Sequence, residues 1–342
     1  MAEIVTMGEI MLRLSPPGYQ RFIQASQFDV TYGGSEGNIA ACLANYGHDT
    51  AYITKLPSNA IADCVVASLR KSNVDCSMIV RGGKRLGTYF LENGASVRPA
   101  SVVYDRADSA MAEAKPEDFD FEKCLKGVKW FHTSGITPVI GKGTAEAVKE
   151  ALIVAKKNGA IVSFDLNYRG KLWSDEIEEK QKIMSELMEY VDICFGNARD
   201  AALVLGYKDG DTDFINGDYS ICVNEENMKK VLKKYGFKYI VSSLRESISA
   251  SDNGYSAVVV SEDDMYIGKK YMVHIVDRVG SGDAFASGFI HGIISGKTKE
   301  KALDFAIASA VIKHTIPGDF NFASVEEVEK LSGGDGAGRV QR

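Results

Sequence analysis

Strand-like and helix-like segments alternate along most of this chain of 342 residues. Short apolar runs predict β-strands, and longer segments with apolar residues at helical spacing predict α-helices. The predicted strands are 4–7, 129–132, 161–165, 193–195, 238–242, 257–260 and 272–276. The predicted helices are 38–46, 144–158, 284–294 and 301–313. This alternation is typical of an α/β fold in which helices cover both faces of a mainly parallel sheet.

Two segments, 12–32 and 75–106, interrupt this alternation. They carry period-two patches and turn signals in place of helical repeats. We expect them to form a small antiparallel sheet that covers the carboxyl end of the larger sheet as a lid. Residues 1–11, 33–74 and 107–331 would then form the α/β core, and the glycine-rich residues 332–342 a flexible tail.

The composition excludes several classes of function. With 40 Lys and Arg against 46 Asp and Glu, the formal net charge is −6, which argues against a nucleic-acid-binding surface. The six cysteines include no Cys-x-x-Cys pair, so neither a zinc site nor a disulfide framework is indicated, and a reducing cytoplasm is the expected location. No apolar run is long enough to span a membrane, and the amino terminus reads as a first strand rather than a signal peptide.

The segment 276–285 carries the most specific chemistry. Gly280 and Gly282 flank Ser281 in a turn after a predicted strand, and Asp283 opens the helix that follows. Glycine allows backbone N–H groups to converge at a helix start, where an anion such as phosphate binds. The segment therefore suits an anion cradle beside a catalytic base, as phosphoryl transfer to an alcohol requires. A left-handed turn followed by a helix cap would account for the same residues.

Two further motifs place polar groups at predicted strand ends or helix starts. Gly33 and Gly34 precede a helix that contains Asn38, where backbone can approach a ligand closely. Asn167 and Arg169 follow the strand 161–165, at the edge where open α/β sheets bind ligands. The planar guanidinium of Arg169 suits a carboxylate, although a local ion pair in a loop explains it equally well.

The remaining candidates lie on predicted loops and on the lid. Asn197 and Asp200 follow the strand 193–195 and could arrange water around a magnesium–phosphate complex, or simply cap a helix. Tyr104 and Arg106 end the second lid segment. The other two candidates are Tyr89, on a lid strand, and Asp319, in the turn after the last predicted helix.

Together these motifs resemble the ribokinase-like, or PfkB, family of carbohydrate kinases, and the resemblance spans nearly the whole chain. Within that family the pattern is most similar to 2-keto-3-deoxygluconate kinases. The resemblance implies a ribokinase-like three-layer α/β/α domain with a mainly parallel central sheet and a small β-sheet lid. It also implies ATP-dependent phosphorylation of 2-keto-3-deoxygluconate on its terminal hydroxyl, giving 2-keto-3-deoxy-6-phosphogluconate.

The resemblance further implies a role for each candidate residue. Asp283 would be the general base, and the amides of Gly280, Ser281 and Gly282 would hold the transferred phosphoryl group. The expected sugar-acid contacts are Gly33, Gly34, Asn38, Tyr89, Tyr104, Arg106, Asn167, Arg169 and Asp319. The expected nucleotide contacts are Asn197, Ser243, Arg245, Gly280 and Gly282. Asn197 and Asp200 would hold magnesium through water, and a monovalent cation is left open as a further cofactor.

Three residues or loops depart from the family pattern. Ser281 stands where a small Ala or Gly is usual, Asp200 replaces a Glu, and the loop 243–249 lacks a Gly-x-x-Gly. Two alternatives therefore remain: a fructokinase or other ketose kinase of the same family, and a non-catalytic sugar sensor. A dinucleotide oxidoreductase is excluded, because no Gly-x-Gly-x-x-Gly unit lies near the amino terminus. We expect a homo-oligomer that pairs through the exposed lid.

Overall fold

A ten-stranded sheet runs through the molecule in the computed structural model, which describes residues 2–216 and 219–334. The strand order is β13-β12-β11-β10-β9-β8-β1-β4-β5, with β14 pairing with β12. Its strands are β1 (Ile4–Met7), β4 (Thr50–Leu56), β5 (Ile79–Arg81), β8 (Trp130–Ser134), β9 (Ile161–Asp165), β10 (Ile193–Phe195), β11 (Tyr239–Ser247), β12 (Asp252–Val260), β13 (Met265–Ile267) and β14 (Tyr271–His274). All pairings from β5 to β11 are parallel, and the β12 pairings are antiparallel. The mainly parallel sheet predicted from the sequence is confirmed.

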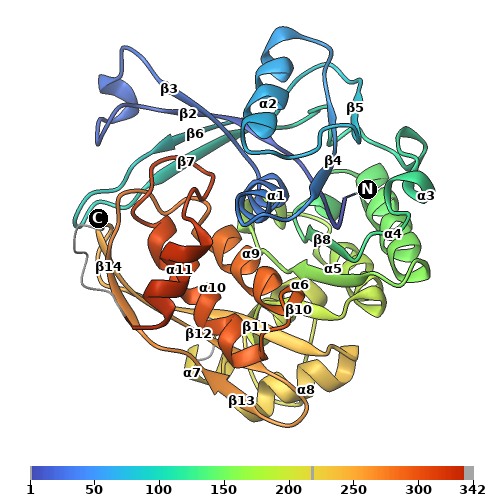
Figure 1. Cartoon of the computed structure of the whole chain (residues 1–342), viewed down its shortest axis with the longest axis vertical. Helices are drawn as coiled ribbons and strands as arrows, with labels where there is room; N and C mark the ends of the chain where they lie inside the picture. The colour runs from blue at the N-terminus through green and yellow to red at the C-terminus, as the bar shows by residue number, and fades with distance from the viewer. Residues whose placement is uncertain (1, 217–218, 335–342) are drawn as a thin grey trace.

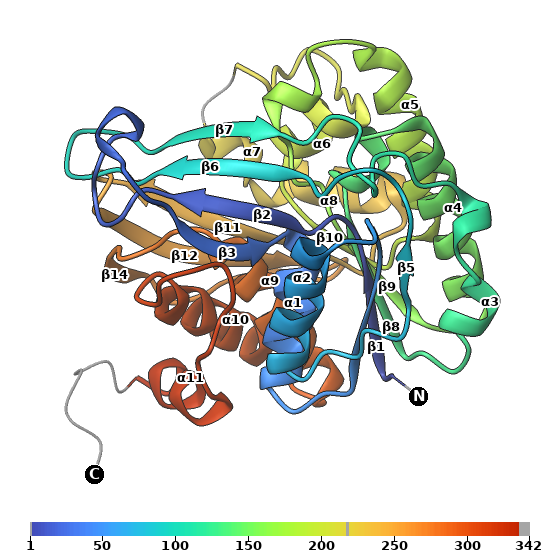
Figure 2. The ribbon, with the colours of Figure 1, turned by 90° about the horizontal axis from the view of Figure 1, so that it is seen from above.

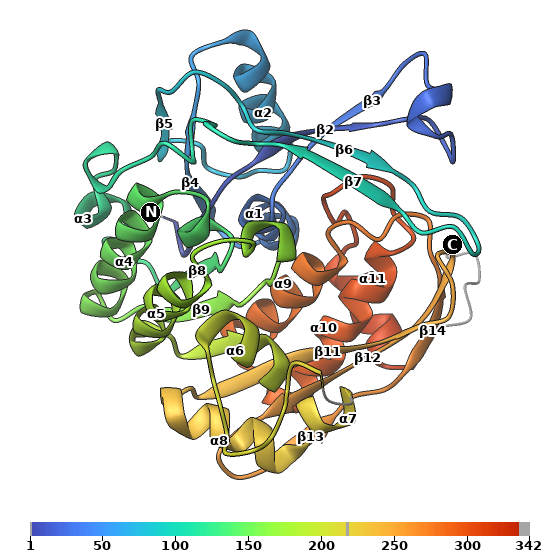
Figure 3. The ribbon, with the colours of Figure 1, turned by 180° about the vertical axis from the view of Figure 1, so that it is seen from behind.

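Two groups of helices cover the two faces of this sheet. One core joins the sheet to α1 (Ser35–Asn45), α9 (Ser281–Ile294) and α10 (Lys299–Lys313). The other core joins the opposite face to α3 (Phe121–Cys124), α4 (Lys142–Lys157), α5 (Ile177–Leu187), α6 (Ala198–Leu205) and α8 (Glu225–Tyr235). Figures 1 and 3 show the two groups on opposite sides, with β8, β9 and β10 between them. Among the described helices, α2 (Ala60–Lys71), α7 (Tyr219–Cys222) and α11 (Val325–Ser332) contribute no buried residue to these two cores.

Close packing against α10 fixes the position of α9, whose first turn carries the Gly-x-Gly-Asp motif. A Cβ on Gly288 would lie 2.7 Å from the Cα of Ala306, and one on Gly292 would lie 2.6 Å from the Cα of Ala302. Only glycine permits so close an approach between the two helices. On its other side α9 packs against the sheet through the fully buried Phe289, whose ring contacts Phe195 and Tyr239, so the helix rests on a close-packed support.

A second sheet of four strands projects over the carboxyl ends of the large one (Figure 2). It consists of β2 (Met11–Ser15), β3 (Asp29–Gly33), β6 (Thr88–Glu92) and β7 (Ser101–Asp105) in the order β3-β2-β6-β7. The expected antiparallel sheet is wrong at its centre, since two hairpins meet there through a parallel β2–β6 pairing. The proposed lid boundary also needs correction: β5 pairs with β4 in the large sheet, and Ile79 packs with the core around α2.

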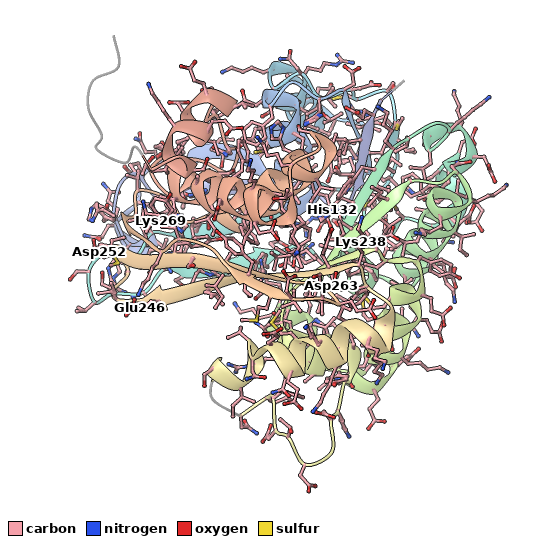
Figure 4. All side chains as sticks on the ribbon, turned by 60° about the horizontal axis from the view of Figure 1, so that its bottom comes forward. His132, Lys238, Glu246, Asp252, Asp263 and Lys269 are labelled. Atoms are coloured by element: carbon pink, nitrogen blue, oxygen red, sulfur yellow. The ribbon has the colours of Figure 1, made fainter. Side chains whose placement is uncertain are left out.

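The tip of the small sheet touches the tip of the long β11–β12 hairpin. Figure 4 shows that hairpin between α8 and the α9–α10 pair, with Glu246 and Asp252 labelled near its far end and Lys238 at its start. There the carbonyl of Ser96 accepts a hydrogen bond from the amide of Ala250 at 2.7 Å, and the Ser96 amide donates to the Ser251 hydroxyl at 2.9 Å. These bonds hold the tip of the lid against the large sheet.

Within the described residues, no helix has the length and apolar character needed to cross a membrane. The predicted flexible tail lies mostly in 335–342, outside the described residues.

Candidate active site

A cavity of about 980 Å³ lies between the small sheet and the carboxyl ends of the large sheet. Side chains and backbone from both sheets and from the starts of α1, α6 and α9 line it. The predicted site residues that border it are Gly33, Gly34, Asn38, Tyr89, Tyr104, Arg106, Asn167, Arg169, Asn197, Asp200, Ser243, Arg245, Gly280, Ser281, Gly282, Asp283 and Asp319. The fold thus brings every candidate from the sequence to one place.

Asp283 lies in the first turn of α9 and faces the start of α1. Its Oδ1 accepts a hydrogen bond from the Ser35 hydroxyl at 2.8 Å, and its Oδ2 accepts one from Asn38 Nδ2 at 2.7 Å. Burial raises the pKa of Asp283 above its ordinary value, while the two hydrogen bonds act in the opposite direction. Two donors fix the orientation of the carboxylate, and the raised pKa strengthens it as a proton acceptor.

The turn before Asp283 has the geometry of an anion cradle. Gly280 adopts φ +79°, and a Cβ there would overlap the carbonyl oxygen of Asp319. The first intrahelical bond of α9 joins Ala284 N to Gly280 O, so the amides of Gly282 and Asp283 precede it without helical partners. A side chain on Gly282 would extend into open space. The Ser281 hydroxyl donates to Arg278 O, so the serine in place of Ala or Gly turns away from the cradle.

Two carboxyl groups in the cavity wall, the buried Glu36 and the half-buried Asp165, were not assigned as site residues from the sequence. Glu36 in α1 is 1 % exposed, and burial raises its pKa to about 7. Burial likewise raises the pKa of Asp165 at the end of β9 to about 7, and the negative charges of Asp283 and Asp200 add to the effect. The position of Asp165 after an apolar strand was a usable signal, whereas Glu36 reads in the sequence as an ordinary helix-start acid.

Replacing Glu36 by Gln should stabilise the protein above neutral pH. A carboxyl group with a raised folded-state pKa stabilises fully below its unfolded value of 4.5, and that contribution is lost as pH rises through about 7. Gln keeps an acceptor for the Thr137 hydroxyl without a charge. We expect the variant to gain on the order of 2 kcal/mol in free energy of unfolding at pH 8, and the gain to shrink towards pH 5.

Urea unfolding of both proteins at several pH values measures this difference. Glu146→Gln, an exposed substitution in α4, is the matched control and should show no such pH-dependent gain. An equal effect of Glu36→Gln at pH 5 and pH 8 would contradict a buried, titrating carboxyl group.

The lid side of the cavity is built on a buried charge network. Arg13 in β2 pairs with Asp277 at 2.9 Å and with Asp319 at 3.0 Å, and its guanidinium is almost completely buried. Asp319 also accepts hydrogen bonds from the hydroxyls of Tyr89 and Thr31. Asp319 and Tyr89, both predicted as sugar contacts, therefore bind each other and join the lid to the turn after α10.

The cationic side chains in the cavity differ in their pairing. Arg106 is paired with the buried carboxylate of Glu9. The guanidinium of Arg169 is exposed, and its Nη1 donates to the carbonyl of Tyr168 at 3.1 Å. Lys171 donates to the lid carbonyl of Val102 at 3.0 Å. Arg169 is therefore better placed than Arg106 to receive a carboxylate from outside.

At the start of α6, Asn197 and Asp200 form a reciprocal cap. The side-chain oxygen Oδ1 of Asn197 accepts from the backbone amides of Arg199 and Asp200, and the Asp200 carboxylate accepts from the backbone amide of Asn197 at 3.0 Å. Within the described residues, no group of three or more acidic, His or Cys side chains could hold a metal ion. Asp200 and Asp165, however, offer the hard oxygen atoms that suit a magnesium ion carrying its own water.

Comparison with known proteins decides the family. The family model described as pfkB family carbohydrate kinase matches residues 1–322. This chain belongs to that family. It is a carbohydrate kinase with a ribokinase-like fold, as the sequence motifs predicted.

Three relatives show how far the similarity extends. The crystal structure of 2-dehydro-3-deoxygluconokinase from Thermotoga maritima has 49 % sequence identity and a TM-score of 0.91, covering 97 % of this chain and 98 % of its own. A 2-dehydro-3-deoxygalactonokinase from Haloferax volcanii is 32 % identical, covering 98 % of both chains. A 5-dehydro-2-deoxygluconokinase from Clostridium perfringens is 29 % identical over 91 % of this chain and 86 % of its own.

Proposed function

We propose that this carbohydrate kinase transfers the γ-phosphoryl group of ATP to the terminal hydroxyl of 2-keto-3-deoxygluconate. The observation that carries the proposal is the placement of Asp283. Two hydrogen-bond donors orient its carboxylate beside the anion cradle at the start of α9, in a cavity that arginine side chains also line. The relatives named for keto-deoxy sugar acids support an acidic sugar as the acceptor.

The chemistry follows from the arrangement of Asp283 and the amides. Asp283 takes the proton of the terminal hydroxyl, whose oxygen attacks the γ-phosphorus while the bond to ADP breaks. The amides at the start of α9 hold the charge that gathers on the phosphoryl oxygens. Magnesium, brought with the nucleotide and held through water by Asp200 and Asp165, would neutralise the phosphate charge. The lid excludes water, which limits hydrolysis of ATP.

Substrate selection follows from charge. A sugar acid brings one carboxylate, and the exposed fork of Arg169 can accept it with two parallel hydrogen bonds. Tyr104 lies on the lid near Arg106 and Lys171, whose cations lie about 6 Å from its ring. A neutral ketose would leave Arg169 without an anion, so the acid is the expected substrate.

Arg169→Ala should therefore lower kcat/KM for the sugar acid by about 10- to 100-fold, since a charge-assisted contact contributes about 1.5–3 kcal/mol. The same variant should leave the weaker phosphorylation of fructose nearly unchanged, which makes the neutral sugar the internal control. Coupled detection of ADP release with both sugars measures the two values. Equal losses with both would assign Arg169 to the nucleotide or to the fold.

Arg169→Lys separates charge from shape. It keeps the positive charge and loses the planar fork, so kcat/KM for the acid should lie between those of wild type and Arg169→Ala. A panel of sugar acids and neutral ketoses with ATP and magnesium then tests the proposed substrate itself. Turnover of ketoses alone would favour the fructokinase alternative, and binding without turnover would favour a sensor.

A further inference from the structure

A lysine side chain with no exposed surface ends α10. Lys313 is 0 % exposed, although lysine normally keeps its ammonium group in water. Burying an unpaired ammonium costs several kcal/mol, so a retained buried lysine needs oxygen atoms or negative charge around it. No sequence motif singled it out.

The ammonium group lies beneath the anion cradle of residues 280–283, which is called the phosphate cradle from here on. The Cε atom of Lys313 would be 3.3 Å from a Cβ on Gly280, and Nζ donates to the carbonyl of Ile316 at 2.9 Å. The next residue, His314, uses its carbonyl to accept the amides of Val276 and Asp277, at 2.8 and 3.1 Å. The end of α10 and the loop that leads to the cradle thus form one hydrogen-bonded unit.

The two buried carboxylates around Lys313 are neutralised only when its ammonium group is counted together with Arg13. Asp277 and Asp319 lie in this unit, and Arg13 pairs with both of them. One guanidinium offsets one of the two carboxylates. Burial lowers the pKa of Lys313, and the charge of Arg13 acts in the same direction, whereas Asp277, Asp319 and Asp283 oppose this effect and favour the charged form. A second cation at Lys313 brings the structural pair of carboxylates to neutrality.

The same atoms would be needed to hold an alkali cation behind the cradle. Such an ion needs several oxygen ligands, but the Ile316 carbonyl is bonded to Lys313, and Asp277 and Asp319 are bonded to Arg13. The residues present therefore do not fit the monovalent cation that the family resemblance left open.

We propose that Lys313 is a positioning residue that supplies a built-in cation beneath the phosphate cradle, so that phosphoryl transfer in this kinase needs no bound monovalent cation. This inference rests on the proposed kinase chemistry at Asp283. The ammonium holds the turn at Ile316 against the loop of Gly280 and adds positive potential behind the amides that face the phosphoryl group.

The first test needs no variant. The kcat of the wild-type enzyme should be the same in K⁺, Na⁺ or tetramethylammonium chloride at one ionic strength, with magnesium constant. Its ADP affinity, measured by calorimetry in the same salts, should also be unchanged. A kcat or an ADP affinity that falls strongly when K⁺ and Na⁺ are both replaced by tetramethylammonium would overturn the proposal.

The second test removes the charge. Lys313→Met should lower kcat by about tenfold or more with little change in the KM for sugar, and should weaken ADP binding. In Lys313→Ala, which leaves space, added K⁺ or ethylammonium should restore part of the lost kcat. Lys301→Met, an exposed change on the same helix, is the control and should behave as wild type.

The outcomes separate this inference from the assigned function. Full kcat and ADP affinity in folded Lys313→Met would refute the built-in cation, even if 2-keto-3-deoxygluconate is the substrate. If no sugar acid is phosphorylated, the proposed function fails, while ADP affinity in the different salts and in Lys313→Met still tests the cation. If neither variant folds, the wild-type salt series decides alone.

Discussion

Asp283→Ala is expected to lower kcat by about 10³-fold, within the 10²- to 10⁴-fold range of a positioned general base. The loss should fall on kcat rather than on the KM for the sugar, because Asp283 acts on the proton that moves during transfer. Asp283→Asn should be nearly as impaired, since the amide keeps the shape and can bond to Ser35 but cannot accept the proton. Coupled ADP release with saturating ATP measures both variants.

Asp263→Asn serves as the matched control for charge removal. Asp263 is exposed in the turn between β12 and β13, as Figure 4 shows, and should leave kcat unchanged. Retention of most activity by Asp283→Ala would mean that another group accepts the proton. Asp165, which lines the same cavity and has a pKa raised to about 7, would then be the next residue to test.

Gly280→Ala should abolish most activity and destabilise the fold together. The added Cβ would overlap the Asp319 carbonyl oxygen, and the backbone at φ +79° disfavours any L side chain. To remove this overlap, the cradle loop must move away from the turn at Asp319. The backbone amides of the cradle would then no longer point at the phosphoryl group. We expect kcat to fall by about 10²-fold or more, comparable with loss of one oxyanion donor. We also expect the free energy of unfolding to fall by about 2–4 kcal/mol.

Gly236→Ala separates the two causes. Gly236 ends α8 with φ +73°, and a Cβ there meets no other atom within 4 Å. The Gly236→Ala variant has an L residue at positive φ, but its Cβ overlaps no other atom. It should therefore lower the free energy of unfolding by about 1 kcal/mol and leave the activity unchanged. If Gly280→Ala cost no more stability than Gly236→Ala and kept its kcat, the Asp319 carbonyl would not limit the cradle.

Much of the fold was readable because buried parallel strands are continuous apolar runs. The bounds of β1, β9 and β10 agree with the sequence prediction to the residue. The sequence predicted less about how strands from distant segments pair with each other. The parallel β2–β6 pairing joins segments about 75 positions apart, and nothing in either segment encodes its partner's direction. The helix α8 was left unassigned, although Met228, Val231 and Leu232 follow helical spacing.

Most of the candidate residues in the large domain were predictable as a set, because they follow a strand or open a helix, and such ends converge at one edge of a parallel sheet. Their pairings were not. Ser35 bonds to Asp283 across 248 positions, and Arg13 reaches Asp277 across 264. Pattern analysis treats an arginine or lysine as a surface residue, so the burial of Arg13 and Lys313 becomes visible only in three dimensions.

The ion pairs of Arg13 limit how the lid of this kinase can be exchanged for the lid of another. A lid exchanged between two sugar kinases would bring its own residue at this position beneath the recipient's phosphate cradle. If an uncharged residue replaced Arg13, the buried carboxylates of Asp277 and Asp319 would lose the guanidinium that pairs with both of them. Sugar preference and nucleotide chemistry are therefore not separable modules in this chain: a graft that changes the first must carry Arg13 to preserve the second.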